Sequence, residues 1–118
     1  VLYCGIDASR RGGKNLGTTW TGGIYDLDYW VMPKGGKNRD AAIKYIAMAS
    51  SANEQAEYAK LISYGPTNTK AMAKLDKTVL DKLPTSAANS KTALQFNVGF
   101  WADQGEALEK RFAAWAAQ

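Results

Sequence analysis

Histidine is absent from this chain of 118 residues, and Cys4 is its only cysteine. The chain therefore has no imidazole for acid–base catalysis and no histidine ligand for zinc. A single cysteine can form neither an internal disulfide nor a cysteine-cluster metal site. No apolar run approaches the roughly 18 residues that a membrane-spanning helix requires. We expect a soluble protein that needs no metal and no cofactor.

The chain does contain enough apolar material for one folded domain, because 46% of its residues are hydrophobic and four are Trp. Its net charge of +4 would suit a nucleic-acid partner, but most of its lysines stand singly along the chain. A surface that neutralises a run of phosphates needs a denser stripe of basic side chains. We therefore expect no nucleic acid as a partner, and an affinity that falls steeply with salt would contradict this expectation.

Two carboxylates and three aromatic rings lie within the segment GGIYDLDYWVMP at residues 22–33. If the segment is a strand, its side chains alternate, so that Asp26, Asp28 and Trp30 share one face. Burying unpaired carboxylates is costly. One interpretation places the acids at a solvated strand end or pairs them with basic side chains elsewhere. The other places a ligand ammonium between them and the aromatic rings, where charge pairing and cation–π attraction act together.

An enzymatic use of the same acids is not predicted. Asp26 and Asp28 could form a general acid–base pair, but no nucleophile, metal-ligand set or oxyanion motif accompanies them. The pairs Gly12-Gly13 and Gly22-Gly23 lack the spacing of phosphate-binding loops and are interpreted as turns. Cys4 has no histidine to activate it and is interpreted as a small buried residue. We expect a binding protein and not an enzyme.

Three strands are predicted near the N-terminus, at residues 1–3, 16–20 and 24–32, where β-branched and aromatic residues are frequent. A short helix or turn over residues 5–11 ends at Gly12-Gly13, and Pro33 closes the third strand. The chain is then predicted to be mainly helical from residue 38 onward.

Asn38 is a candidate N-cap for the first of these helices, and Ser51 with Glu54 has the form of a capping box for the second. Two shorter helices are expected over residues 69–75 and 77–83, followed by a loop at 85–90. The spacing of four apolar side chains predicts a final helix that docks one face onto the rest: Trp101, Leu108, Phe112 and Trp115.

Several motifs follow one another in an order that resembles a known family. They are GGIYDLDYWVMP, KGGKN, DAAIKYIAMASS, YGPTN and QFNVGFW. Together they resemble the C-terminal stretch of the polyamine (spermidine/putrescine) binding proteins of bacterial ABC importers, which are extracellular solute-binding proteins. The resemblance implies an α/β fold of the type II periplasmic-binding-protein class. Residues 1–118 would be a single portion of it, with strands and hinge crossings over 1–33 and mainly helices over 38–118.

The resemblance also implies a set of ligand-binding residues. Asp28 matches the family's cleft Asp and would be the main acceptor for an ammonium group, with help from Asp26. Tyr3 and Tyr64 would pack on the methylene chain of the ligand. The full implied set is Asp28, Asp26, Tyr3, Tyr64, Gln95 and Trp20.

The chain departs from the family pattern at two places near this site. Asp26 stands where the family has a Trp, and Cys4 stands where it has an Asn. The first departure adds negative charge and removes an aromatic wall. The ligand would then be held more by charge, or another cationic solute would be preferred.

The implied partners are a polyamine and an ABC permease in the membrane, and the implied location is periplasmic. In this family a solute shifts the protein toward a closed form that the permease recognises. The family's N-terminal lobe is missing, so that lobe or a second copy of this chain is a further expected partner. The alternative hypothesis is a stand-alone lobe that binds no solute and self-associates through exposed strand edges.

Overall fold

The computed structural model describes residues 2–118, so Val1 lies outside the described residues. Helices account for most of the ordered structure, and the two strands are each two residues long. In chain order the elements are α1 (Tyr3–Arg11), β1 (Ile24–Tyr25), α2 (Arg39–Ala49), α3 (Ala52–Leu61), α4 (Thr69–Met72), α5 (Lys77–Leu80), β2 (Leu94–Gln95) and α6 (Val98–Ala116).

Side-chain caps fix where several helices begin. The Ser51 hydroxyl accepts a hydrogen bond from the Glu54 amide at the start of α3, which confirms the predicted cap at this position. Asp76 caps α5 and Asn97 caps α6 in the same way. The predicted cap at Asn38 is wrong in detail, because α2 starts after Asn38 but the Asn38 side chain makes no capping hydrogen bond.

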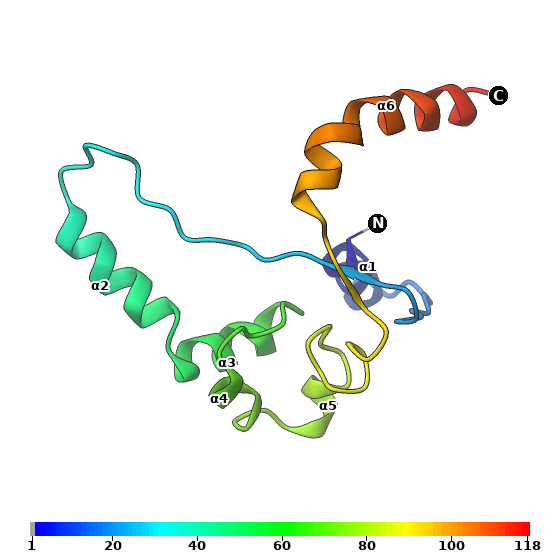
Figure 1. Cartoon of the computed structure of the whole chain (residues 1–118). Coiled ribbons are helices and arrows are strands. Elements are labelled where there is room, and N and C mark those ends of the chain that lie inside the picture. Colours follow the sequence, from blue (N-terminus) through cyan, green and yellow to red (C-terminus); the bar gives the residue numbers. More distant parts are fainter. Residues whose placement is uncertain (1) are drawn as a thin grey trace.

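The core lies among α3, α4, α5 and the turns that follow α5. It consists of small apolar side chains and two leucines, with Leu83 fully buried: Ala56, Ala59, Ala71, Leu75 and Leu83. We call residues 52–90 the body. α3 contacts both α2 and α4, and Figure 1 shows α3, α4 and α5 gathered in one part of the molecule.

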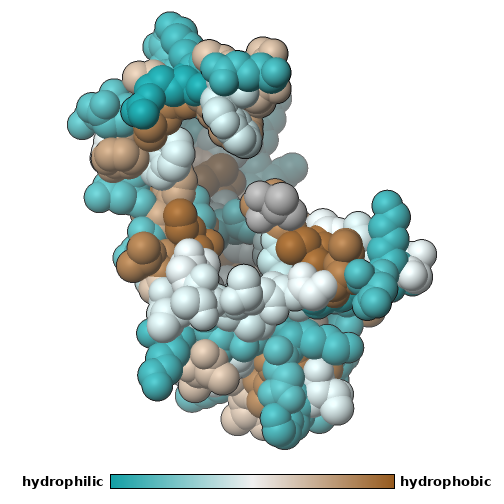
Figure 2. Space-filling view, turned by 90° about the vertical axis from the view of Figure 1, so that its right-hand side faces the viewer, coloured by the Kyte–Doolittle hydropathy of each residue, from teal (hydrophilic) through white to brown (hydrophobic). Residues whose placement is uncertain are grey.

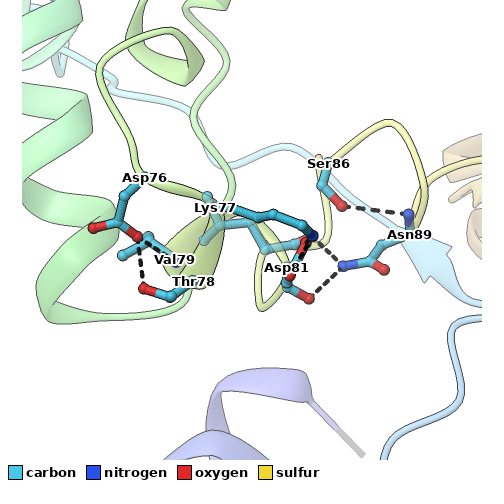
Figure 3. A network of polar contacts seen from close by, with 8 residues as sticks. Asp76, Lys77, Thr78, Val79, Asp81, Ser86 and Asn89 are labelled. Atoms are coloured by element: carbon cyan, nitrogen blue, oxygen red, sulfur yellow. Dashed lines mark hydrogen bonds and ion pairs between the residues drawn. The ribbon is translucent and has the colours of Figure 1, made fainter.

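Polar contacts close the end of the body where α5 gives way to turns (Figure 3). Lys77 Nζ pairs with Asp81 Oδ2 at 2.7 Å, one turn along α5. The Asn89 side chain donates to the main-chain oxygens of Asp81 and Leu83, at 3.0 and 2.8 Å. Hydrogen bonds from Thr78 and Val79 lower the pKa of Asp76. The predicted loop at residues 85–90 is therefore a series of turns tied back to α5.

The sheet consists of β1 and β2, which run parallel in the register Ile24 with Leu94 and Tyr25 with Gln95. The Leu94 amide donates to Gly23 O and the Phe96 amide to Tyr25 O, each at 2.8 Å. This pairing joins two segments that are far apart in the sequence. Parallel pairing requires a long connection between the strands, and the whole body with α2 provides it.

The predicted strands are mostly wrong. Tyr3 begins α1 and no strand forms over residues 16–20, while only Ile24–Tyr25 of the predicted strand 24–32 is paired. A strand is maintained by a hydrogen-bonded neighbour, and residues 94–96 are the only such neighbour that β1 has within the described chain. The helix predicted over 5–11 is confirmed as α1. The two short helices are confirmed as α4 and α5, which are shorter than predicted.

The molecule is open in shape. Its radius of gyration is 17.5 Å, whereas a compact domain of this length would have about 13–14 Å. In Figure 1, α2 and α6 lie at opposite ends, and a long extended segment leads from β1 to α2. The docking predicted for the final helix is wrong for the described residues, since Phe112 and Trp115 of α6 are two-thirds exposed.

Figure 2 shows brown hydrophobic side chains at the surface, on both sides of a hollow in the face that it presents. Among the described residues, no helix is both long and apolar enough to cross a membrane.

Candidate functional site

α1 positions the residues from which the candidate site is built. The helix ends with two basic residues and is followed by Gly12 and Gly13, and Gly13 adopts a positive φ of 87°. Such a backbone conformation favours glycine and stops the helix, as the sequence indicates. One face of α1 carries Asp7 and Arg11, four residues apart, and turns them toward the end of α3.

Asp7 is the most completely enclosed acid of the described chain. Its carboxylate accepts hydrogen bonds from Ser63 Oγ at 2.8 Å and Arg11 Nε at 2.9 Å, and it forms an ion pair with Arg11 Nη2 at 2.8 Å. Burial acts to raise the pKa of Asp7, but the hydrogen bonds from Ser63 and Arg11 outweigh it, so that the pKa is lowered. Asp7 therefore remains a carboxylate and joins α1 to the segment that follows α3.

Arg11 completes this connection. Its second amino group donates to Leu61 O at 2.7 Å, at the end of α3. A cavity of about 130 Å³ lies at the same junction, and its lining residues come from α1 and from residues 61–64: Cys4, Asp7, Ala8, Arg11, Leu61, Ile62, Ser63 and Tyr64. The bonds of Asp7 and Arg11 therefore form a fixed joint between α1 and residues 61–63, and the cavity lies at this joint.

Tyr64 lies at the edge of this cavity, and its phenol is affected by Cys4 and by the predicted site residue Asp28. The pKa of its phenol is raised first by the charge of Cys4 and then by the charge of Asp28, and Cys4 also forms a hydrogen bond with it. Asp28 acts on the phenol through its charge, across the space between the two side chains. Tyr58 packs edge-on against Tyr64, with ring centroids 6.1 Å apart. The Tyr64 ring thus packs against a second aromatic ring and feels the charge of Asp28.

Gly65 fixes the position of Tyr64. A Cβ atom at residue 65 would lie within 3.0 Å of three side-chain atoms of Thr85. Thr85 is short and β-branched, so it has little freedom to move away. Glycine is therefore needed where the turn after α3 passes the turns at the end of the body, and this close approach holds Tyr64 at the cavity edge.

Tyr3 of α1 and Trp20 of the loop that follows it form a second aromatic pair, with ring centroids 4.5 Å apart and planes tilted by 52°. Burial, and then the charge of Asp7, raises the pKa of Tyr3, although Arg10 acts against them through its charge and a hydrogen bond. Arg10 also donates to Leu16 O and to Thr18 Oγ1, both at 2.6 Å. These bonds hold the loop after α1 so that Trp20 reaches Tyr3.

Asp26 and Gln95 lie at the parallel strand pair. Gln95 is opposite Tyr25 in the register, and the exposed Asp26 carboxylate accepts a hydrogen bond from the Leu27 amide at 2.8 Å. The structure thus brings Tyr3 into contact with Trp20, and the charge of Asp28 acts on Tyr64. Cys4, the neighbour of Tyr3 at the start of α1, lines the same cavity as Tyr64. Within residues 2–118, the side chains of Asp26 and Gln95 form no hydrogen bond with Tyr3, Trp20 or Tyr64.

The sequence interpretation missed the network of Asp7, Arg11 and Ser63. The signal available was the spacing of Asp7 and Arg11, which suits an ion pair on one helix face. The helix predicted over 5–11 contains both residues, but this spacing does not relate them to the segment after α3. Ser63 carries no local signal, since its partner lies on a distant segment.

The site has the character of a binding surface. It combines exposed acids with aromatic rings, and no group of histidine, cysteine, aspartate or glutamate within the described residues could hold a metal ion. Residues 6–89 match the family of bacterial extracellular solute-binding proteins. The chain therefore belongs to this family, which confirms the prediction of a non-enzymatic solute-binding protein and of an extracytoplasmic location.

Three individual relatives are similar to nearly the whole of this chain. The chain is 42% identical over 113 residues to the gamma-aminobutyric acid-binding protein of Pseudomonas aeruginosa, covering 96% of this chain and 32% of that protein. Its structure is similar to that of the periplasmic binding protein AgtB of A. tumefaciens R10 in complex with agropinic acid. The TM-score is 0.76 and the identity 34%, over 98% of this chain and 37% of AgtB.

A third relative is an ABC transporter substrate-binding protein from Bradyrhizobium japonicum. The TM-score is 0.73 at 26% identity, over 95% of this chain and 36% of the other. The predicted fold class is confirmed as part of a periplasmic-binding-protein fold. The chain spans about a third of the length of these relatives. The polyamine subfamily named in the sequence analysis is not among them.

Proposed function

We propose that this chain forms part of the solute-binding site of an ABC importer and that its solute carries an ammonium group. The observation that carries the proposal is the aromatic pair of Tyr58 with Tyr64 at the cavity edge, on whose Tyr64 phenol the charge of the exposed Asp28 carboxylate acts. A carboxylate next to an aromatic face binds an alkylammonium by charge pairing and cation–π attraction. In the complete protein, the bound solute would favour a closed form that a membrane permease recognises.

Each predicted residue has a role in this proposal. Asp28 accepts the ammonium group and Asp26 adds negative charge nearby. Tyr64 and the pair of Tyr3 with Trp20 pack on the apolar part of the solute. Gln95, at the strand pair, forms a hydrogen bond with a polar end. The joint made by Asp7, Arg11 and Ser63 keeps α1 fixed against the turn that carries Tyr64.

Two classes of ammonium solute remain to be compared. The resemblance and the acids Asp26 and Asp28 favour a polyamine, which carries only positive charge. The relative that binds gamma-aminobutyric acid favours a short ω-amino acid, which also carries a carboxylate. Arg10 supports the second class. Within the described residues its guanidinium forms no ion pair with a carboxylate, and it lies beside the aromatic pair.

Calorimetric titration of the 118-residue chain with putrescine, spermidine and gamma-aminobutyric acid tests the proposal. We expect at least one of them to bind and Asp28→Asn to weaken its affinity about tenfold. The matched control is Asp40→Asn, which removes an exposed acid from the first turn of α2. An affinity that is unchanged in Asp28→Asn, or that falls equally in both variants, would contradict the role of Asp28.

The same titrations separate the two solute classes. Arg10→Gln should weaken the binding of gamma-aminobutyric acid and leave that of putrescine unchanged or stronger, because only the amino acid has a carboxylate to lose. Asp26→Asn should have the larger effect on putrescine. The absence of heat with all three solutes at millimolar concentration would show that this chain does not bind them by itself.

A further inference from the structure

Asp7 lines the cavity beside Tyr64, and only one of its two carboxylate oxygens is engaged. Oδ2 accepts from Ser63 Oγ at 2.8 Å and from Arg11 Nε at 2.9 Å, and Arg11 Nη2 lies 2.8 Å from the same atom. Oδ1 accepts no hydrogen bond from any residue that the structure describes. Because each oxygen of an ionised carboxylate is an acceptor, Asp7 keeps an unused acceptor.

This free oxygen is accessible, although only 8% of Asp7 is exposed. Within residues 2–118, no side-chain oxygen or nitrogen of a covered residue is both sealed from solvent and without a hydrogen-bond partner. Oδ1 is therefore not sealed, and the opening that reaches it is the cavity that Asp7 lines. A largely buried polar atom without a partner is costly unless water or a ligand supplies one. The remaining acceptor of Asp7 is thus presented to whatever enters the cavity.

The charges around Asp7 determine which kind of group suits this acceptor. Arg11 is ion-paired with the carboxylate, and Lys82, which follows α5, also acts on it through its charge. These two cations outweigh the single acid, so a second ammonium group would be repelled here. A hydroxyl donates a hydrogen bond without adding charge, and its bond to a carboxylate is stronger than a bond to a neutral acceptor. The surroundings of Oδ1 therefore favour an uncharged donor.

The cavity has room for a short part of a solute. Its volume is about 130 Å³, whereas an engineered apolar cavity of about 150 Å³ binds benzene. Ala8, Leu61 and Ile62 form the apolar part of its lining, and Tyr64 stands at its edge with Tyr58 packed against it. A solute whose ammonium group lies at these two rings would extend a few carbon atoms into the cavity, toward Oδ1.

We propose that Asp7 Oδ1 is a further solute-binding atom and that the solute carries, besides its ammonium group, a hydroxyl that donates to it. The inference rests on the proposed ammonium solute and adds the contact that distinguishes hydroxylated from plain members of its class. Asp7 then has two roles. Oδ2 maintains the joint with Ser63 of the body, and Oδ1 selects the solute.

Matched solutes test the inference on the 118-residue chain. Calorimetric titration compares gamma-aminobutyric acid with its β-hydroxy derivative, and putrescine with its β-hydroxy derivative. In a pair that binds, we expect the affinity of the hydroxylated member to be about tenfold higher. The β-fluoro derivative of the same compound is the control, because fluorine resembles a hydroxyl in size but cannot donate. It should bind with the affinity of the parent compound.

Two variants separate this contact from the joint. Asp7→Asn removes the charge of the acceptor, so the hydroxylated solute should keep an advantage of only about threefold. Ser63→Ala is the matched control, because it removes one bond to Oδ2 and leaves Oδ1 in place. It should lower the affinities of both members of a pair by the same factor and preserve their ratio. An unchanged ratio in Asp7→Asn, or an equal fall in both variants, would show that the hydroxyl does not bind to Oδ1.

The titrations also distinguish failure of this inference from failure of the proposed function. Equal affinities within each pair would overturn the role of Asp7 and leave the ammonium solute in place. Absence of binding by every parent and derivative would contradict the proposed ammonium solute together with the inference. The comparison within a pair uses the native chain, so it decides the question even if Asp7→Asn does not fold.

Discussion

The body and the uncovered segments of this molecule are stabilised in different ways. In the body, short helices with side-chain caps surround a small apolar core that contains Leu83, and polar contacts close the turns after α5. Residues 27–32 and α6 also carry large apolar side chains, but most of these are exposed. The contrast shows that apolar composition alone does not predict burial, because a side chain is buried only where the described chain provides a neighbour.

Leu83→Ala and Phe112→Ala test this contrast with the largest expected effect. Leu83 is fully buried in the body, so its truncation should lower the free energy of unfolding by about 2–5 kcal/mol. Phe112 in α6 is exposed, and its truncation should change the free energy by no more than about 0.5 kcal/mol. Urea denaturation followed by circular dichroism measures both. Similar losses in the two variants would mean that α6 is packed in solution.

Asp7→Asn tests the joint between α1 and the body. The variant keeps the shape of the side chain but loses its charge pair with Arg11, and we expect a loss of about 1–3 kcal/mol in the free energy of unfolding. Serine at position 63 can still donate to the amide oxygen. Arg11→Gln is the complementary variant, and it should cost a similar amount if the charge pair is responsible.

The pH dependence provides a further check on the same residue. The pKa of Asp7 is lower in the folded protein than the usual value of 3.8. Its contribution to stability is therefore fully present above that value and is lost as the pH falls through the lower, folded pKa. The native chain should lose more stability than Asp7→Asn when the pH is lowered from 5 to about 2. Parallel acid titrations of the two would contradict the assignment.

Ser51→Ala has the smallest expected effect within the body. It removes the hydroxyl that accepts from the Glu54 amide, at a cost of about 1 kcal/mol. Asn38→Ala is the matched control, because Asn38 precedes α2 without a capping hydrogen bond and its loss should cost a few tenths of a kcal/mol at most. Thermal denaturation of the two variants distinguishes them, and a larger loss in Asn38→Ala would reverse the comparison.

Local signals in the sequence predicted the local structure well. The N-cap at Ser51, the helix end at Gly12-Gly13 and the two helices flanking Asp76 depend on neighbours within a few residues, and all are present. The reciprocal half of the capping box is not formed, because the Ser51 amide donates to Met48 O. The predicted strand over 24–32 and the docked final helix depend on distant partners. The sequence carries the apolar pattern that would suit such partners, but the pattern does not say whether they lie within the same chain.

The contacts of the candidate site also depend on residues that are distant in the sequence. The grouping of Asp28 with Tyr64 is a prediction of the family resemblance alone, since no spacing in the sequence relates residues so far apart. The contact of Tyr3 with Trp20 depends on the bonds that Arg10 makes to the intervening loop, which no motif marks. The polyamine came from the resemblance alone, and the relatives found by comparison do not show it.

Because Gly65 lies so close to Thr85, we expect substitutions at these two positions to be coupled in evolution. Any side chain at residue 65 would overlap Thr85, so a substitution there becomes tolerable only after Thr85 has become smaller. We expect homologous sequences with alanine at position 65 to carry glycine or alanine at position 85. Drift at this pair would also move Tyr64, so two positions outside the cavity lining would set the shape of the cavity edge.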